Sequence, residues 1–248
     1  MIDCASSWEN DFDTGELLVS RGVSSLDLLI ITNYDEDHVR GLPRLLDQQV
    51  DVVRLRRNLR AEPQTINYLK DLKPGPGIAA LINMAGEYTA TAAGLDIPDV
   101  RITTYSHAYP DFEDENNLSL VTVLELGAAV VLFPGDVECA GWEALLDDNP
   151  DLCAILPRVT VFVASHHGRE TGICDRIFDD LGCARKLVVI SDKGYMYETQ
   201  ETVPYYRSNV DGRWTFRDRT RQALTTRNDG YMVFTIDRSQ DGRYMGAR

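Results

Sequence analysis

The chain has 248 residues with 25 Lys and Arg against 39 Asp and Glu, which gives a formal net charge of −14. A hydrophobic fraction of 44% and a charged fraction of 26% exclude wholesale disorder and collagen-like repeats. No apolar run approaches the roughly 18 residues of a membrane span, so we expect no membrane partner. The first four residues carry neither a basic segment nor an apolar core, which argues against a secretory signal. Five scattered Cys without a C-x-x-C pair favour free thiols and a cytoplasmic protein.

The acidic balance disfavours a protein that coats nucleic acid, because a long phosphate footprint requires a basic face. The positive charge is nevertheless clustered. Four Arg residues lie between Arg54 and Arg60, and five more lie between Arg213 and Arg227. Guanidinium groups match phosphate oxygens in pairs, so each cluster suits either a phosphate-bearing ligand or a solvated surface paired to acidic residues.

Short apolar runs typical of β-strands alternate with helical patterns along the chain. In chain order, we expect strands at 28–32, 100–104, 119–126, 129–134, 159–164, 187–191 and 231–236, and helices at 41–48, 63–72, 139–147, 173–181 and 200–207. The two runs joined around Gly127 predict a hairpin. The stretch 73–94, with two Pro and two Gly residues at its start, predicts an excursion over the surface. No repeat or long linker divides the chain, so we expect one domain over residues 1–248.

A polar loop directly follows the first expected strand. Residues 33–38 read Asn-Tyr-Asp-Glu-Asp-His, and a helical pattern begins just after them. Alternation sends the side chains of Asn33, Asp35 and Asp37 the same way, and His38 can chelate beside Asp37. Carboxylate and imidazole together suit a hard to borderline divalent ion. The same acidic residues also suit a helix N-terminus, so the loop alone leaves both interpretations open.

Two further strand ends carry residues of the metal-ligand type. The run 129–134 leads into Gly135-Asp136, and the run 159–164 leads into Ser-His-His-Gly. The second segment holds two of the four His residues of the chain, His166 and His167. Asp136 suits either a ligand or a helix N-cap, and the adjacent His residues suit either ligands or a buried structural pair.

This ordered set of motifs resembles the metallo-β-lactamase superfamily. The closer likeness is to the hydrolase domain of the ComEC/Rec2 competence proteins, whose first motif is His-x-Asp-x-Asp-His. Segments 1–4, 116–121 and 188–191 resemble further parts of that group, so the likeness covers nearly the whole chain. It implies an α/β fold, the αββα four-layer sandwich, with Asp3 supporting the metal loop from behind. The chain begins where the family usually has two earlier strands, so either its start is trimmed or an edge of the fold is lost.

Carried over to this sequence, the family pattern implies a second metal site that is intact. Its ligands resemble Asp37, His38 and one of His166 and His167, and spacing does not decide between these two. Asp136 resembles the carboxylate that bridges two ions.

The first metal site departs from the family pattern. Asp35 resembles one of its ligands, but Asn33, a neutral and weak ligand, stands where the family has its first His. Asn116 and Asn117 stand where many members have another His, and His107 is the only other upstream imidazole. We therefore expect this site to be oxygen-rich or vacant and to favour Mn²⁺ or Mg²⁺, with one or two divalent ions, Zn²⁺ or Mn²⁺, in the whole centre.

The resemblance implies hydrolysis by a metal-activated water, with Asp35, Asp37 and Asp136 as the catalytic carboxylates. Relatives imply cleavage of the phosphodiesterase or nuclease type, and the acidity of the chain favours a phosphate-containing small molecule or a short nucleic acid. Lys193 and Tyr195 suit either substrate contacts or a plain surface turn. The alternatives are hydrolysis of a carboxylic ester or lactone, because a fold does not fix a function, and a non-catalytic binding module with a degenerate metal site.

Overall fold

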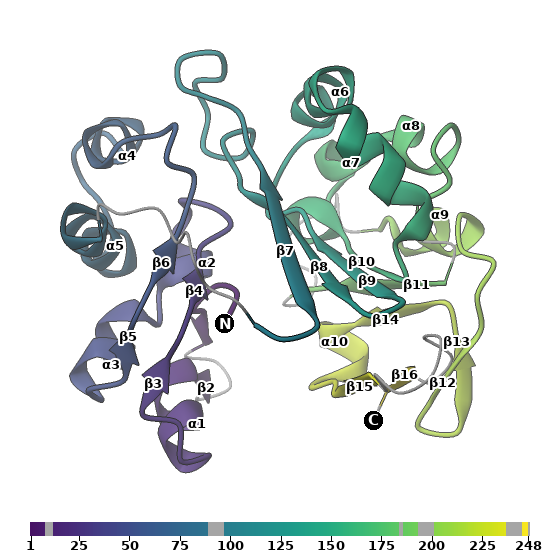
Figure 1. The fold of residues 1–248 in the computed structure, drawn as a ribbon, viewed down its shortest axis with the longest axis horizontal. Coiled ribbons are helices and arrows are strands. Elements are labelled where there is room, and N and C mark those ends of the chain that lie inside the picture. The colour runs from purple at the N-terminus through teal and green to yellow at the C-terminus, as the bar shows by residue number, and fades with distance from the viewer. Residues whose placement is uncertain (8–11, 89–96, 184–185, 193–200, 237–244, 248) are drawn as a thin grey trace. The chain divides into compact units, whose positions relative to one another are not determined.

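The computed structural model describes residues 1–7, 12–88, 97–183, 186–192, 201–236 and 245–247 (Figure 1). The chain divides into two compact units. Unit 1 comprises Met1–Leu95 and Ser106–Leu120, and unit 2 comprises Asp96–Tyr105 and Val121–Arg248. The single domain expected over residues 1–248 stays a prediction. Among the described residues, no helix combines the length and the apolar character needed to cross a bilayer.

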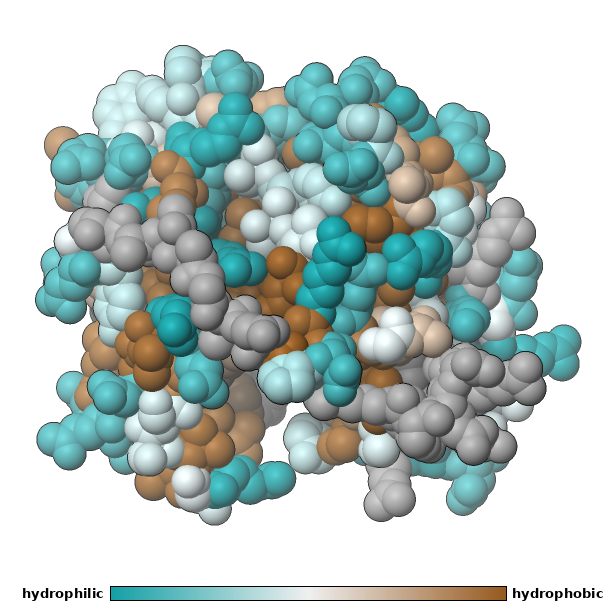
Figure 2. Space-filling view, viewed as in Figure 1, coloured by the Kyte–Doolittle hydropathy of each residue, from teal (hydrophilic) through white to brown (hydrophobic). Residues whose placement is uncertain are grey.

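The described residues of unit 1 form three pairs of two-residue strands and five helices. The antiparallel pair is β1 (Ser6–Ser7) with β2 (Phe12–Asp13), and the parallel pairs are β3 (Ser25–Leu26) with β5 (Asp51–Val52) and β4 (Leu29–Ile30) with β6 (Leu55–Arg56). The helices are α1 (Thr14–Ser20), α2 (Glu36–Val39), α3 (Leu42–Asp47), α4 (Pro63–Leu69) and α5 (Pro76–Glu87). Their shared core contains Leu29, Leu42 and Leu81, all with no exposed surface. In the view of Figure 2, apolar residues also show at the surface around α1 and β3.

The expected surface excursion over 73–94 is wrong for residues 76–87, which form α5. This helix buries Ile78, Leu81 and Met84 in the core of unit 1. Its N-cap residue Gly75 has no capping side chain. The carboxylate of Glu36 caps the helix instead, because it accepts hydrogen bonds from the backbone N–H groups of residues 77 and 78 at 2.8 and 3.1 Å.

Unit 2 is built on a six-stranded sheet in the order β14-β11-β10-β9-β8-β7. The strands are β7 (Val100–Tyr105), β8 (Val121–Leu126), β9 (Ala129–Phe133), β10 (Val161–Val163), β11 (Leu187–Ile190) and β14 (Ala223–Thr225). The predicted hairpin is confirmed: β8 and β9 are antiparallel, Leu126 faces Ala129, and Gly127 takes the positive φ (63°) that such a tight turn requires. From β9 to β14 the strands are parallel, so their carboxyl ends meet at one edge of the sheet.

Helices cover one face of this sheet and a smaller sheet covers part of the other (Figure 1). The helices are α6 (Cys139–Asp148), α7 (Pro150–Ile155), α8 (Asp175–Phe178) and α9 (Val203–Ser208). The smaller sheet contains β12 (Trp214–Phe216), β13 (Arg219–Arg221), β15 (Phe234–Ile236) and β16 (Met245–Ala247), and α10 (Thr226–Asp229) follows β14. Trp142 of α6 is fully buried on the helical side, whereas Phe216 packs with Leu187 and Val189 on the other. The outward side of α6 is hydrophilic in Figure 2.

Candidate metal centre

In unit 1, the loop after β4 holds the ring of His38 from behind. Nδ1 of His38 lies 2.9 Å from Oδ2 of Asp3 and 3.2 Å from Oγ1 of Thr32. Asp3 is itself fixed, because it accepts hydrogen bonds from the backbone N–H and the hydroxyl of Thr32, both at 2.7 Å. A carboxylate beside Nδ1 keeps the proton on that nitrogen and leaves the lone pair on Nε2. This arrangement is typical of histidines that bind a metal through Nε2.

The two carboxylates of the same loop have different surroundings. Asp35 accepts a hydrogen bond from the ammonium group of Lys70, which also donates to Glu115 at 2.7 Å. Burial lowers the pKa of Lys70, but the two carboxylates outweigh it and the net shift is upward. Lys70 is therefore charged, and it offsets the charge of Asp35 within unit 1. Asp37 lies half-buried in the first turn of α2.

Asn33 is buried, with only 1% of its surface exposed. Its Nδ2 donates to Oγ of Ser119 at 3.1 Å and to Oδ1 of Asn116 at 3.4 Å. Its Oδ1 is buried and has no hydrogen-bond partner among the described residues. The structure thus brings Asn33 and Asn116 together, whereas Asn117 binds Asp114. An orphaned amide oxygen fits a weak, uncharged ligand for a hard cation.

In unit 2, Asp136 and His167 come together at the carboxyl ends of β9 and β10. Nε2 of His167 lies 3.6 Å from Oδ2 of Asp136, whose residue is only 3% exposed. Nδ1 of His167 lies 2.9 Å from the carbonyl oxygen of Ser191 at the end of β11. Because a carbonyl only accepts, Nδ1 carries the proton and Nε2 keeps the lone pair. His167 therefore repeats, with a backbone acceptor, the arrangement of His38.

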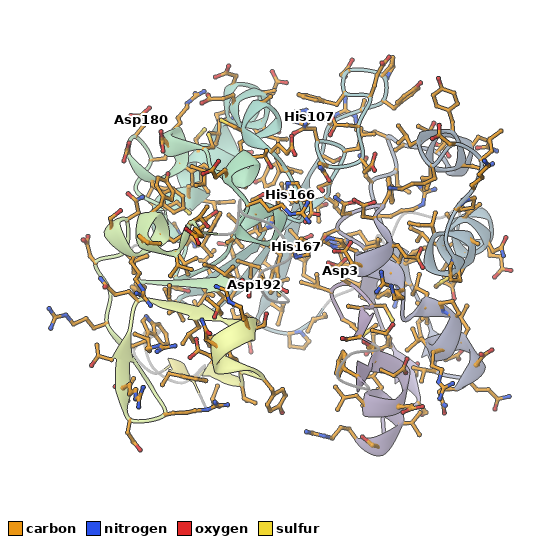
Figure 3. The ribbon with its side chains drawn as sticks, turned by 180° about the vertical axis from the view of Figure 1, so that it is seen from behind. Asp3, His107, His166, His167, Asp180 and Asp192 are labelled. Carbon is orange, nitrogen blue, oxygen red and sulfur yellow. The ribbon has the colours of Figure 1, made fainter. Side chains whose placement is uncertain are left out.

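His166 differs from its neighbour although the two rings lie side by side (Figure 3). Nε2 of His166 accepts a hydrogen bond from Arg169 at 2.8 Å, and its Nδ1 lies 2.8 Å from Oγ1 of Thr171. Burial lowers the pKa of His166. Both His166 and His167 have left-handed backbone conformations, with φ of 49° and 55°. Such strain costs about 1–3 kcal/mol per residue and concentrates at functional sites.

The sequence predictions missed Asp192, which directly follows Ser191 at the end of β11 and interacts electrostatically with His167 (both are labelled in Figure 3). Asp192 is 6% exposed, and its Oδ2 lies 3.5 Å from Nη1 of Arg227. Burial raises the pKa of Asp192, and Arg227 partly opposes that rise. The signal was available: an acidic residue directly after an expected strand is the pattern that singled out Asp136. The expected substrate contacts Lys193 and Tyr195 lie outside the described residues.

One arginine of each cluster has a clear partner within the chain. In the first cluster, Arg57 is buried and donates to the carbonyl oxygens of Asn58 and Ala61. In the second, Arg221 pairs with Asp229. Arg221 thus fits the alternative of an arginine paired to an acidic residue, whereas Arg57 fits neither expectation, because it is buried against backbone carbonyls.

Comparison with known proteins identifies the class to which this fold and these motifs belong. A family model described as the metallo-beta-lactamase superfamily matches residues 1–166, about two thirds of the chain. The chain therefore belongs to the metallo-β-lactamase superfamily, whose members are mostly metal-dependent hydrolases and typically bind divalent metals. The mixed α/β fold of this family, predicted from the sequence, is confirmed.

Among individual proteins, the chain is similar to ComE operon protein 3 of Bacillus subtilis (strain 168). The two are 28% identical over 169 residues, which cover 65% of this chain and 20% of that protein. The chain thus spans about a fifth of the length of this relative. The predicted relation to the ComEC-like group is confirmed.

Proposed function

We propose that this chain is a metal-dependent hydrolase that cleaves phosphodiesters, with Asp37 and His38 of unit 1 and Asp136 and His167 of unit 2 as metal ligands. One observation carries the proposal: two buried or half-buried histidines, His38 and His167, each have Nδ1 fixed to an oxygen acceptor. Both rings therefore keep a lone pair on Nε2, as a metal ligand requires. A divalent ion bound by such residues polarises the substrate and lowers the pKa of a bound water towards 7.

The residues of this chain contribute positioning and charge. Asp3 and the carbonyl of Ser191 fix the two ring orientations, so neither imidazole has to reorganise when the ion binds. The buried carboxylate of Asp136 contributes negative charge where the surroundings exclude water, and it would be the base or orienting group nearest to His167. The left-handed backbone at His166 and His167 places both residues directly after β10.

The first metal site is weaker by the same reasoning. Asn33 offers a single uncharged oxygen, and Lys70 offsets the charge of Asp35. We therefore propose one firmly held ion, Zn²⁺ or Mn²⁺, with any second ion held by oxygen and favouring Mn²⁺.

Two features support a phosphodiester substrate of small size. The ComEC-like relation implies phosphodiester chemistry, and the net charge of −14 disfavours a long nucleic-acid footprint. We propose a phosphate-containing small molecule or a short nucleic acid.

The experiment compares His167→Ala with the matched control His166→Ala, after purification without chelator. His167→Ala should bind less metal than the parent and should lose turnover of bis-p-nitrophenyl phosphate. His166→Ala should retain bound metal, because Nε2 of His166 is already used by Arg169. Full turnover by His167→Ala contradicts the ligand assignment. A parent protein that binds far less than one equivalent of metal supports the binding module, and faster turnover of a carboxylic ester or lactone supports the other enzyme class.

A further inference from the structure

A second cluster of metal-ligand side chains lies elsewhere in unit 2. Cys139 and Glu143 lie on α6, and Cys174 is the residue that precedes α8. The two sulfur atoms and a carboxylate oxygen all lie within 4.8 Å of one another. Both thiols are free. None of these three residues belongs to the proposed hydrolytic centre.

One spacing within the cluster matches an edge of a tetrahedral metal site. Cys139 and Glu143 are four residues apart on one helix, so their side chains share a face. Sγ of Cys174 lies 3.6 Å from Oε1 of Glu143. With Zn–S near 2.3 Å and Zn–O near 2.0 Å, two ligands at a tetrahedral angle lie about 3.5 Å apart. One edge of the tetrahedron is therefore already formed.

A neighbouring guanidinium fixes the carboxylate. Nη1 of Arg176 donates to Oε2 of Glu143 at 2.9 Å and to Asp147 at 2.7 Å. Oε2 is thus engaged, and the other oxygen, Oε1, is the one nearest to Cys174. A ligating carboxylate is generally held by such a hydrogen bond.

The charges of the cluster favour a cation. Cys174 is fully buried, and its thiol lies against the carboxylate of Glu143. A divalent ion would supply the positive charge that stabilises both thiolates beside Glu143. Soft thiolates select Zn²⁺ over hard ions such as Mg²⁺.

We propose that Cys139, Glu143 and Cys174 form a separate site for a thiophilic divalent ion such as Zn²⁺. Water completes the coordination on the side of Cys139, which is exposed. The ion links the start of α6 to the segment before α8. That segment contains Thr171, which contacts Nδ1 of His166, so the site braces the neighbourhood of the histidine pair.

The test is a titration of the reduced, metal-free full chain with Co²⁺, read by the thiolate-to-cobalt charge-transfer absorption. The proposed hydrolytic centre has only nitrogen and oxygen ligands, so this absorption reports the cysteine site alone. We expect one equivalent to produce the band, and Zn²⁺ to displace it. Asp136→Ala should keep the band, so failure of the hydrolytic proposal and failure of this one remain distinguishable.

Three variants define the site. Cys139→Ser should abolish the band, and because Cys139 is exposed the variant should fold normally. The matched control Cys153→Ser should keep it, since Cys153 donates to the carbonyl of Leu146 on α6 and is not part of the cluster. Arg176→Gln should lower Zn²⁺ affinity roughly 10- to 100-fold.

Two results would overturn the proposal. One is a parent protein without the band, or a band that persists in Cys139→Ser. The other is a Cys139–Cys174 disulfide, seen as the loss of two hydrogen atoms in the intact mass, that forms in air at the same rate with and without Zn²⁺. That result would assign the pair of thiols to redox chemistry.

Discussion

Replacing Asp3 by Asn changes the hydrogen-bond partner of Nδ1 in the His38 ring. The backbone N–H of Thr32 donates to Oδ1 of Asp3, so the amide of an Asn is held with its oxygen on that side. Its NH₂ group then replaces Oδ2, which lies 2.9 Å from Nδ1 of His38. An NH₂ group donates, so Nδ1 must accept and the ring proton moves to Nε2. The nitrogen that we propose as the metal ligand loses its lone pair in the favoured tautomer.

The magnitude follows from this exchange. Loss of a carboxylate behind a ligating histidine costs about 10- to 100-fold in metal affinity, or roughly 1.4–2.7 kcal/mol. The folding stability of the metal-free chain should fall by only about 0.5–2 kcal/mol, because neutral hydrogen bonds replace charge-assisted ones. The backbone should be unaffected, since Asp3 has a φ of 54° and Asn tolerates positive φ as Asp does.

The assay is competition for Zn²⁺ against a chromophoric chelator, together with nitrogen NMR of the imidazole tautomer. Asp71→Asn is the matched control, because Asp71 also has a positive φ (52°) but is exposed and distant in sequence from the loop. Asp3→Asn should weaken Zn²⁺ binding and shift the His38 tautomer, and Asp71→Asn should do neither. Unchanged affinity in Asp3→Asn, with a shifted tautomer, would refute the role assigned to His38.

Two further predictions concern the packing of α5 and the first metal site. Gly77→Ala should lower the free energy of unfolding by about 1–3 kcal/mol, because a Cβ there would lie 2.5 Å from the backbone oxygen of Val39. In the same helix, a Cβ at Gly86 meets nothing within 4 Å, so Gly86→Ala should raise the free energy of unfolding by about 0.5–1 kcal/mol. A denaturant melt measures both changes. In a Cys139→Ser background, which removes the proposed cysteine site, Asn33→His should raise affinity at the first site and shift its preference from Mn²⁺ towards Zn²⁺ in parallel titrations. A Cys139→Ser protein that already binds two Zn²⁺ tightly would contradict the role of Asn33.

The sequence was sufficient for β7 to β11 and for β15, because their apolar runs are continuous and end at turn residues. It missed the short strands β12, β13, β14 and β16. The sequence was insufficient for α5, because the start of this helix is stabilised by Glu36, a residue of the loop 33–38 that is distant in the chain. The Pro and Gly residues at the start of the stretch 73–94 are typical of a turn, so local propensity predicts a turn there. Pro76 at the first helical position, followed by Ile78 and Leu81 on one face, was the local signal for a helix.

The spacing of the motifs predicted which residues could be metal ligands, but it did not predict their hydrogen-bond partners. It could not separate His166 from His167, because adjacent residues differ only in which acceptors and donors their rings meet. In the structure, Arg169 and Thr171 engage one ring, while the carbonyl of Ser191 orients the other. Such partners come from segments that fold back onto the strand end, and no local pattern encodes them.

In the loop 33–38 of unit 1, the negative charge of Asp35 is balanced by a cation of the chain itself. Lys70 donates hydrogen bonds to Asp35 and to Glu115 from a largely buried position. A bound ammonium and a tightly held dication compete for the same carboxylate, because like charges repel strongly where water is excluded. Replacement of an imidazole by the amide of Asn33 removes a strong ligand, and Lys70 removes the need for an ion to balance Asp35. Both features weaken the first site, so the weak first site that we propose rests on the charge balance of Asp35 as well as on Asn33.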